Sequence, residues 1–363
     1  MKHKVVFFLC GLLCLSLLCG CGVIAQSVTG NLPQASGDST ETSGDASGDI
    51  DVSVVEEKLS HVDASSGTVK AYETKAWSLL DWSDAAEYDA VMTAKKLVAS
   101  MSEEPRIVAT SPATVSICDA LDLELVGVSE SALTEIPERY VGVTTVGSAM
   151  SPDMEQIGAL DPDWILSPVS LAEDLQPKYA QLDSEYAFLN LSDLVGMFQS
   201  IDELGTIFQR EEQAKKLETE FVSFYSAYQS LYGAEEKPKV LILMGLPGSY
   251  VIATDQSYIG SLVELAGGEN VYSGESEAFI SVNTEDLETM NPDIILRAAH
   301  ALPDSVTEMF QEEFATNDIW KHFTAVQEGR VYDLPYDVFG MSANFQYQEA
   351  LEELAVLFYE EGE

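Results

Sequence analysis

Histidine is scarce in this chain, with 4 copies among 363 residues, so each position can be judged separately. An imidazole side chain can bind a metal ion or transfer a proton near neutral pH. A predicted strand at residues 294–296 runs into a loop that carries His300. His3, His61 and His322 fall instead in an apolar leader, a polar linker and an expected helix. A loop histidine is often only a surface residue, so both interpretations stay open at this point.

Met150 is a second residue with ligand chemistry, and it lies in the loop 147–153. Its thioether sulfur is a soft metal ligand. We expect Ser151 in the same loop to cap the helix that follows. Most loop methionines bind nothing. The position of Met150 makes it a candidate ligand, because ligands of open α/β sheets bind beyond the carboxyl ends of the strands.

The cysteines predict neither a disulfide framework nor a thiolate metal cluster. Of 5 Cys, Cys10, Cys14 and Cys19 lie in the leader and Cys21 directly follows it. Cys118 lies in an apolar segment, where we expect a small buried hydrophobic residue. The sequence contains no Cys-x-x-Cys motif, phosphate-binding loop or nucleophile–base pair. We therefore do not expect an enzyme.

Residues 1–20 have the pattern of a secretory signal, with Lys2 and Lys4 before an apolar run. The run ends in Leu18-Cys19-Gly20-Cys21, which resembles a bacterial lipobox. This resemblance implies that Cys21 is lipidated and becomes the first residue of the mature protein. The remaining sequence has no other segment long and apolar enough to predict a membrane span. We expect the protein at the extracytoplasmic face of a bacterial cell membrane, most simply in a Gram-positive cell.

The formal net charge is −43, from 18 Lys+Arg against 61 Asp+Glu. Nucleic-acid binding requires a basic surface, so this composition excludes nucleic acid as a partner. Hydrophobic residues make up 46% of the chain, which is enough to build a sizeable core. Most of the acids lie from residue 67 onward, so the acidity belongs to the folded body and not to a tail.

The body shows strand–helix alternation twice, which predicts an α/β fold of two Rossmann-like lobes facing a cleft. The segment 155–166 matches the segment 285–296, and in both a helix ends at a Pro-Asp turn before an apolar strand. We expect a single long α-helix to join the lobes. The predicted regions are a signal at 1–20, a flexible acidic tether at 21–70, an extra helical segment at 71–104, an N-terminal lobe at 105–207, the connecting helix at 208–233 and a C-terminal lobe at 234–363.

Several motifs of the body resemble ABC-transporter solute-binding proteins of the siderophore/haem/cobalamin type, and in particular their haem-binding branch. The resemblance covers most of residues 105–360 but not the tether or the extra helical segment. It rests on GSAMSPD at 147–153, PKVLILMGLPGSY at 238–250, SYIG at 257–260, LAGGENV at 265–271, NPDIILRAAH at 291–300, TNDIWKHF at 316–323 and FGMSAN at 339–344.

This resemblance implies that Met150 and His300, one from each lobe, hold the iron of haem b (iron protoporphyrin IX) from opposite faces. Neutral imidazole and a soft thioether are both suitable iron ligands. Two axial ligands leave a six-coordinate iron, which suits a carrier. Met341 is the main rival to Met150 as the sulfur ligand. The acidic body would repel anionic haem propionates at long range, so capture must depend on local contacts.

Weaker expectations concern the haem pocket. Thr110, Ser111 and Thr114 lie at a helix start whose free N–H groups suit a propionate, although they could equally be ordinary capping residues. Arg139 could reach the same edge. Tyr336 and Met341 could supply apolar wall, as could Phe339, or belong to the core.

Two glutamates have a separate interpretation. Glu155 and Glu285 occupy matching positions in the repeat. In proteins of this type one exposed glutamate per lobe docks on arginines of the permease, and the resemblance implies that role here. The alternative is two solvated acids in the first turn of a helix, where they complement the helix dipole.

The resemblance thus implies a membrane-anchored solute-binding protein that delivers haem to an ABC permease and its ATPase. A haem-donating surface protein is a further expected partner. The alternative keeps the transporter class but changes the cargo to a ferric siderophore or a corrinoid. Siderophores bring their own iron ligands, so the Met150 and His300 pair argues against that cargo.

Overall fold

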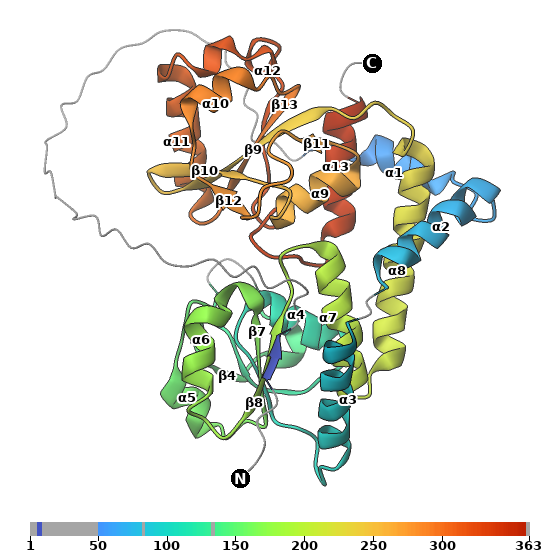
Figure 1. Cartoon of the computed structure of the whole chain (residues 1–363), viewed down its shortest axis with the longest axis vertical. Coiled ribbons are helices and arrows are strands. Elements are labelled where there is room, and N and C mark those ends of the chain that lie inside the picture. Colours follow the sequence, from blue (N-terminus) through green and yellow to red (C-terminus); the bar gives the residue numbers. More distant parts are fainter. Residues whose placement is uncertain (1–5, 9–49, 82–83, 132–134, 361–363) are drawn as a thin grey trace, which may run out of the picture.

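Two α/β lobes, each with its own sheet, make up most of the structure (Figure 1). This computed structural model describes residues 6–8, 50–81, 84–131 and 135–360. The two-lobed α/β fold predicted from the sequence is confirmed. The predicted lipidation site, Cys21, lies outside the described residues, as does most of the predicted signal. Residues 6–8 of that signal form a strand, β1 (Val6–Phe8), which cleavage before Cys21 would remove.

The first lobe has an all-parallel sheet in the order β1-β8-β7-β2-β3-β4. Its strands are β1 (Val6–Phe8), β2 (Ile107–Ala109), β3 (Leu125–Val128), β4 (Thr144–Thr145), β7 (Trp164–Pro168) and β8 (Glu185–Leu189). Its helices are α4 (Pro112–Ala120), α5 (Met154–Ala159), α6 (Ala172–Tyr179) and α7 (Leu194–Ile207). All residues of β2 and β7 are buried, as expected for strands covered on both faces.

The second lobe has a mixed sheet in the order β12-β10-β9-β13-β14, and β11 pairs separately with β9. Strands β9, β13 and β14 are parallel, whereas β10 is antiparallel to β9 and β12. The strands are β9 (Lys239–Leu246), β10 (Ser249–Ala253), β11 (Glu269–Asn270), β12 (Phe279–Ile280), β13 (Ile294–Ala299) and β14 (Val331–Asp333). The helices are α9 (Tyr258–Ala266), α10 (Thr284–Thr289), α11 (Pro303–Thr316), α12 (Thr324–Gln327) and α13 (Tyr347–Ala355).

The sequence repeat corresponds to a structural repeat. In the first lobe α5 leads into β7, and in the second α10 leads into β13. The aspartate of the Pro-Asp turn has the same structural role in both lobes. The Asp163 carboxylate accepts a hydrogen bond from the backbone N–H of Arg106 at 2.9 Å, and Asp293 accepts one from Lys239 at 2.7 Å. Each aspartate therefore fixes the start of the strand beside its own.

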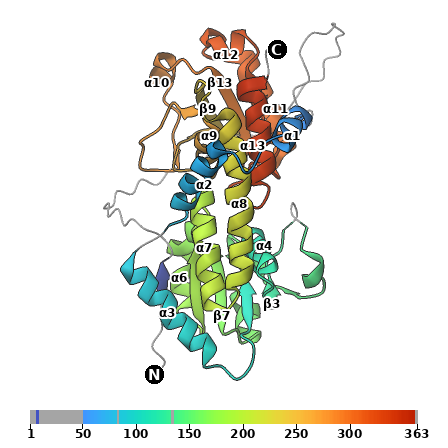
Figure 2. The ribbon, with the colours of Figure 1, turned by 90° about the vertical axis from the view of Figure 1, so that its right-hand side faces the viewer.

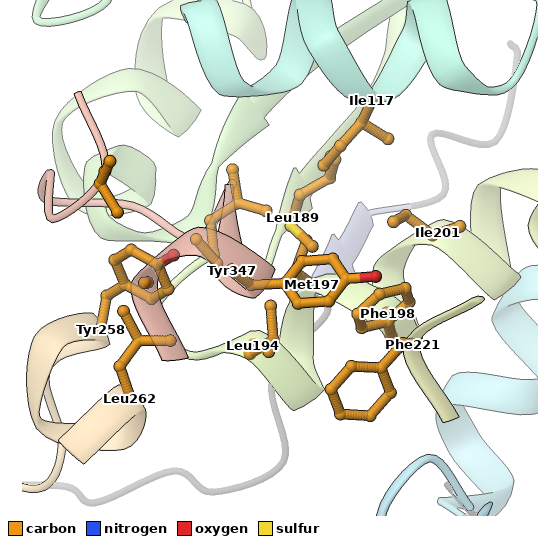
Figure 3. Close-up of a cluster of buried hydrophobic side chains, with 14 of the residues drawn as sticks. Ile117, Leu189, Leu194, Met197, Phe198, Ile201, Phe221, Tyr258, Leu262 and Tyr347 are labelled. Atoms are coloured by element: carbon orange, nitrogen blue, oxygen red, sulfur yellow. The ribbon is translucent and has the colours of Figure 1, made fainter. Parts of the chain in front are cut away.

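The chain passes from the first lobe to the second through α8 (Glu211–Tyr232), which runs alongside both (Figure 2). The C-terminal segment also touches the first lobe, because Ala343 donates its backbone N–H to the carbonyl of Leu191 at 2.9 Å. Rings from both parts of the chain meet there, with Tyr347 edge-on to Phe198 and Phe221 (Figure 3). The two lobes therefore share a hydrophobic core where they are joined beside α8.

The predicted tether at 21–70 extends too far along the chain. The structure has a helix α1 (Ser53–Ser60) there, and α2 (Gly67–Leu79) begins inside the predicted tether. A further helix, α3 (Ala85–Ala99), completes an N-terminal helical segment, defined here as α1–α3. Val55 is fully buried, so packing on distant parts of the chain explains why a polar, Ser-rich region folds here. No described helix is long and apolar enough to cross a membrane.

The N-terminal helical segment contacts both lobes and the helix between them. Lys58 of α1 pairs with Glu360, near the C-terminus, at 2.6 Å. The ammonium of Lys215 on α8 lies 3.7 Å from the ring centre of Trp77 on α2. Lys95 of α3 pairs with Glu211 at 2.5 Å, at the start of α8. The segment thus runs along the side of the molecule where the lobes are joined (Figure 2).

Two carboxyl groups meet where α3 packs on α7, and they predict a dependence of stability on pH. Burial, with the neighbouring charge of Glu87, raises the pKa of Glu203 to about 9, and burial also raises the pKa of Glu87. Glu203 therefore binds its proton more tightly in the folded chain than in the unfolded one. The contribution of protonated Glu203 to the stability of the fold is complete below the pKa that this group has in the unfolded chain. It is lost as the pH rises toward 9.

We expect Glu203→Gln to flatten the fall in melting temperature between pH 5 and pH 9, because the amide has no proton to lose. Thermal melts across that range check the prediction, with the exposed Glu124→Gln as the matched control. Equal pH slopes for wild type and Glu203→Gln would contradict it.

Candidate functional site

His300 lies directly after β13, in the bend before α11, as predicted. Its backbone N–H donates to the carbonyl of Gly245 in β9 at 2.9 Å, which extends the β9–β13 ladder to the base of the side chain. The side chain is half-buried. Its Nδ1 atom is buried without a hydrogen-bond partner among the described residues. Because Nδ1 is buried, a ligand of this imidazole would have to bind through Nε2.

A buried ion pair holds the strand that carries His300. The Nε of Arg297 donates to a carboxylate oxygen of Asp333 in β14 at 2.7 Å, and a second guanidinium N–H meets the other oxygen. The Arg297 guanidinium also lies 4.9 Å from the ring centre of Phe314 in α11. This pair was not predicted from the sequence. Its signal was a charged residue inside an otherwise apolar strand, which needs a partner when buried.

Met150 lies in the tight turn of a β-hairpin formed by β5 (Gly147–Ser148) and β6 (Ser151–Pro152). Gly147 has a φ of 83°, and a Cβ added there would lie 2.9 Å from the carbonyl oxygen of Ser151, so the hairpin requires glycine at this position. Met150 is 72% exposed, which is unusual for a large apolar side chain. The hairpin therefore leaves the Met150 side chain largely accessible to solvent.

The predicted helix cap in this loop is wrong by two residues. Asp153, not Ser151, caps α5, and its carboxylate accepts hydrogen bonds from the backbone N–H groups of Glu155 and Gln156. Ser151 belongs to the hairpin instead. Met150 therefore lies in the turn between two paired strands, and this pairing fixes the backbone on both sides of it.

Thr110, Ser111 and Thr114 lie together at the start of α4, but their hydroxyl groups bond within the fold. Ser111 and Thr114 form a reciprocal capping box, with the Thr114 backbone N–H donating to the Ser111 hydroxyl at 3.1 Å. The Thr110 hydroxyl is buried and bonds to the carbonyl of Leu166 and to Ser167. The geometry thus accounts for the three side chains by helix capping and strand packing.

Arg139 does not lie at that edge of the lobe, contrary to expectation. Its guanidinium contacts Asp122 at 3.1 Å and Glu124 at 3.2 Å, both just before β3 begins. These residues lie at the amino ends of the parallel strands, whereas Thr110 follows the carboxyl end of β2. The local cluster of acids determines where the arginine points.

Tyr336 and Met341 lie in the segment between β14 and α13, the same segment that touches the first lobe through Ala343. Tyr336 is half-buried, and Met341 is 36% exposed. Phe339 between them is fully buried and belongs to the core. Met341 therefore remains available as apolar wall or as a rival sulfur ligand, whereas Phe339 does not.

Of the two repeat-related glutamates, Glu155 is exposed in the first turn of α5. Glu285 lies in α10, the matching helix of the second lobe, but its side chain lies outside the described residues. The helices thus place the two positions equivalently in their lobes.

A cavity of about 800 Å³ lies at the other end of the first sheet and does not include Met150 or His300. It is lined by α3 residues such as Leu97 and by Arg106, Asp163 and Trp164, at the amino ends of the strands. Among the described residues no group of three or more His, Cys, Asp or Glu side chains could hold a metal ion.

The family of this chain follows from its similarity to known proteins. Residues 107–338 match the sequence model of the family described as periplasmic binding protein. This chain belongs to the periplasmic binding protein family. Its two facing α/β lobes are those of such a protein, and the family's members are solute-binding proteins rather than enzymes. The N-terminal helical segment precedes the matched residues.

Two relatives illustrate the similarity within the family. The chain is 45% identical over 261 residues to the high-affinity heme uptake system protein IsdE of Staphylococcus aureus, covering 72% of this chain and 89% of that protein. The crystal structure of S. aureus IsdE complexed with heme has a TM-score of 0.67 at 44% identity, covering 71% of this chain and all of that one.

Other solved structures extend the comparison. An ABC transporter substrate-binding protein of Listeria monocytogenes has a TM-score of 0.68 at 47% identity, covering 71% of this chain and all of that one. The vitamin B12 binding protein BtuF of Vibrio cholerae, 18% identical with a TM-score of 0.56, covers 70% of this chain and 96% of its own. At that identity the likeness concerns the fold alone.

Proposed function

We propose that this chain is the haem-binding component of an ABC importer, holding haem b between its lobes and delivering it to a permease for iron acquisition. The observation that carries the proposal is the pair of candidate ligands, one on each lobe, in a chain 45% identical to a heme uptake protein. His300 lies half-buried at the end of β13, and Met150 is 72% exposed on a hairpin turn. These two residues would bind the iron from opposite faces.

This ligand pair suits a carrier. Neutral imidazole binds both iron oxidation states, and a thioether favours the reduced metal and raises the potential. Binding both axial positions leaves no open site for oxygen or peroxide. The cargo is therefore carried in an unreactive form, which is the requirement of transport.

The first test is a haemin titration of the purified protein. We expect saturation at one haemin per chain, with the absorption spectrum of a six-coordinate low-spin iron. A ferric siderophore or a corrinoid offered in the same assay should not compete for the site. Absence of a Soret shift on adding haemin would contradict the proposal, and competition by a siderophore would favour the alternative cargo.

The protein would dock on the permease through Glu155 and Glu285. An acid on each lobe could form a charge-assisted pair with an arginine of a partner, and two such pairs would fix the orientation of the cleft. The equivalent positions on α5 and α10 support this pairing. The permease and its ATPase are the implied partners.

We expect the double variant Glu155→Ala, Glu285→Ala to bind haemin as wild type does but to stop haem-dependent growth. Uptake assays in cells check this, with the exposed pair Glu173→Ala, Glu269→Ala as the matched control. Normal uptake by the double variant would remove the docking role from these residues.

Attachment to the membrane would depend on lipidation of Cys21, at the outer face of a Gram-positive cell membrane. The net charge of −43 gives no long-range attraction for the haem propionates. Direct transfer from a haem-donating surface protein would avoid that electrostatic barrier. Loss of membrane association in Cys21→Ser would support the anchor, and retained association would contradict it.

A further inference from the structure

Leu302 has a backbone conformation that its residue type disfavours. It lies two residues after His300 with φ 50° and ψ 62°, in the left-handed region. A side chain with a Cβ disfavours that region, and the following residue, Pro303, favours an extended conformation at the position before it. The other described non-glycine residues with positive φ are all polar, namely Asp122, Asp161 and Gln209. Leu302 is therefore the only apolar side chain among the described non-glycine residues with positive φ.

Packing does not explain this conformation. The Leu302 side chain is 59% exposed and makes no cap for α11. Only its carbonyl has a structural role, accepting a hydrogen bond from the Val306 backbone N–H at 3.1 Å. Any residue supplies a carbonyl, and glycine or asparagine would do so with less strain. A strained, exposed leucine indicates selection for something other than the stability of the fold.

Leu302 is one of the few large apolar side chains left exposed in the described parts of the two lobes. Outside the N-terminal helical segment, the described residues include four large hydrophobic side chains at or above 36% exposure: Val141, Met150, Leu302 and Met341. Met150 and Met341 are the two candidate sulfur residues. Leu302 is joined to His300 by two peptide units, which span at most about 7 Å. A flat macrocycle bound through Nε2 would extend over the surface around His300.

We propose that Leu302 is an apolar contact for the porphyrin ring on the His300 face, and that it favours tetrapyrroles over polar iron chelates. The proposal rests on the haem-binding function proposed above. The Leu302 side chain, 59% exposed on this left-handed turn, is accessible to a ligand. Bound haem would cover the Leu302 side chain, so the burial of its apolar surface would add to the affinity for haem.

The test compares Leu302→Asn with Leu302→Met in the full chain. Asparagine is of similar size, accepts the left-handed region and removes the apolar surface, whereas methionine keeps that surface. The measurement is the rate of haemin transfer to excess apomyoglobin, with the melting temperature of the haem-free protein and the axial-ligand absorption bands recorded alongside. Leu79→Asn removes a leucine that is 39% exposed at the end of α2 and serves as the control.

We expect Leu302→Asn to release haemin about tenfold faster than wild type, with unchanged axial-ligand bands and an unreduced melting temperature. Leu302→Met and Leu79→Asn should release haemin at the wild-type rate. A wild-type release rate in Leu302→Asn, or a lower melting temperature with altered bands, would overturn the proposal. If the wild-type chain binds no haemin, the proposed function itself fails, which is a different result from failure of Leu302 alone.

Discussion

His300→Ala is expected to convert the haemin complex from a six-coordinate to a five-coordinate or water-ligated species. The substitution removes the only nitrogen ligand proposed, while β13 and its hydrogen bonds to β9 stay in place. The Soret band should shift and broaden, and haemin should be released at least tenfold faster. Absorption spectra and haemin transfer to apomyoglobin measure both effects.

Met150→Ala is the companion variant, and the two ligands should differ in their effect. A thioether binds ferrous iron better than ferric iron, so loss of Met150 should lower the reduction potential and weaken the ferrous complex most. Met341→Ala identifies the rival sulfur ligand. If Met341→Ala changes the spectrum and Met150→Ala does not, the sulfur ligand has been misassigned. If His300→Ala also leaves the spectrum unchanged, the whole ligand assignment fails.

The second large effect is expected from Asp333→Ala. The substitution leaves the Arg297 guanidinium without its partner at a position where only 8% of the side chain is exposed. Breaking a buried ion pair in this way costs about 3–5 kcal/mol, because the remaining charge is neither solvated nor paired. The free energy of unfolding should fall by that amount in urea titrations.

Asp318→Ala is the matched control for that measurement. Asp318 pairs with Lys321 at 2.6 Å, but its side chain is 84% exposed. Such a solvent-exposed pair adds little to stability, because water screens both charges. Equal losses in the two variants would contradict a special role for the buried pair. Because β13 ends at His300, we also expect Asp333→Ala, and not Asp318→Ala, to weaken haemin binding.

Local signals in the sequence predicted those elements whose ends are set by nearby residues. For α9, Ser257 caps the first turn and Gly267 ends the helix in the left-handed conformation, so both limits are set by residue types that mark helix ends in a sequence. The repeat predicted two equivalent lobes for the same reason, since each Pro-Asp turn acts on its own neighbouring strand. His300 at a strand end followed from that repeat.

Features that depend on distant residues could not be derived in this way. Helix α1 looked like tether because its buried residue, Val55, packs against parts of the chain far along the sequence. The direction of the Arg139 side chain depended on acids brought near by the fold, and the partner of Arg297 lies 36 residues away. The hairpin that presents Met150 was missed because its strands are only two residues long, too short for a periodic pattern.

The N-terminal helical segment has a consequence for the order in which the protein folds. Lys58 of α1 meets Glu360, 302 residues later, and α2 packs along α8 from the middle of the chain. The segment is synthesised before the elements that it packs on, so its packing surface is incomplete until α8, α13 and the residues up to Glu360 have been made. Contacts of such separation form late, because a long loop must close before they contribute. The N-terminal helical segment therefore packs only when the rest of the chain has folded. In a truncated or unfinished chain the segment would be exposed to proteases.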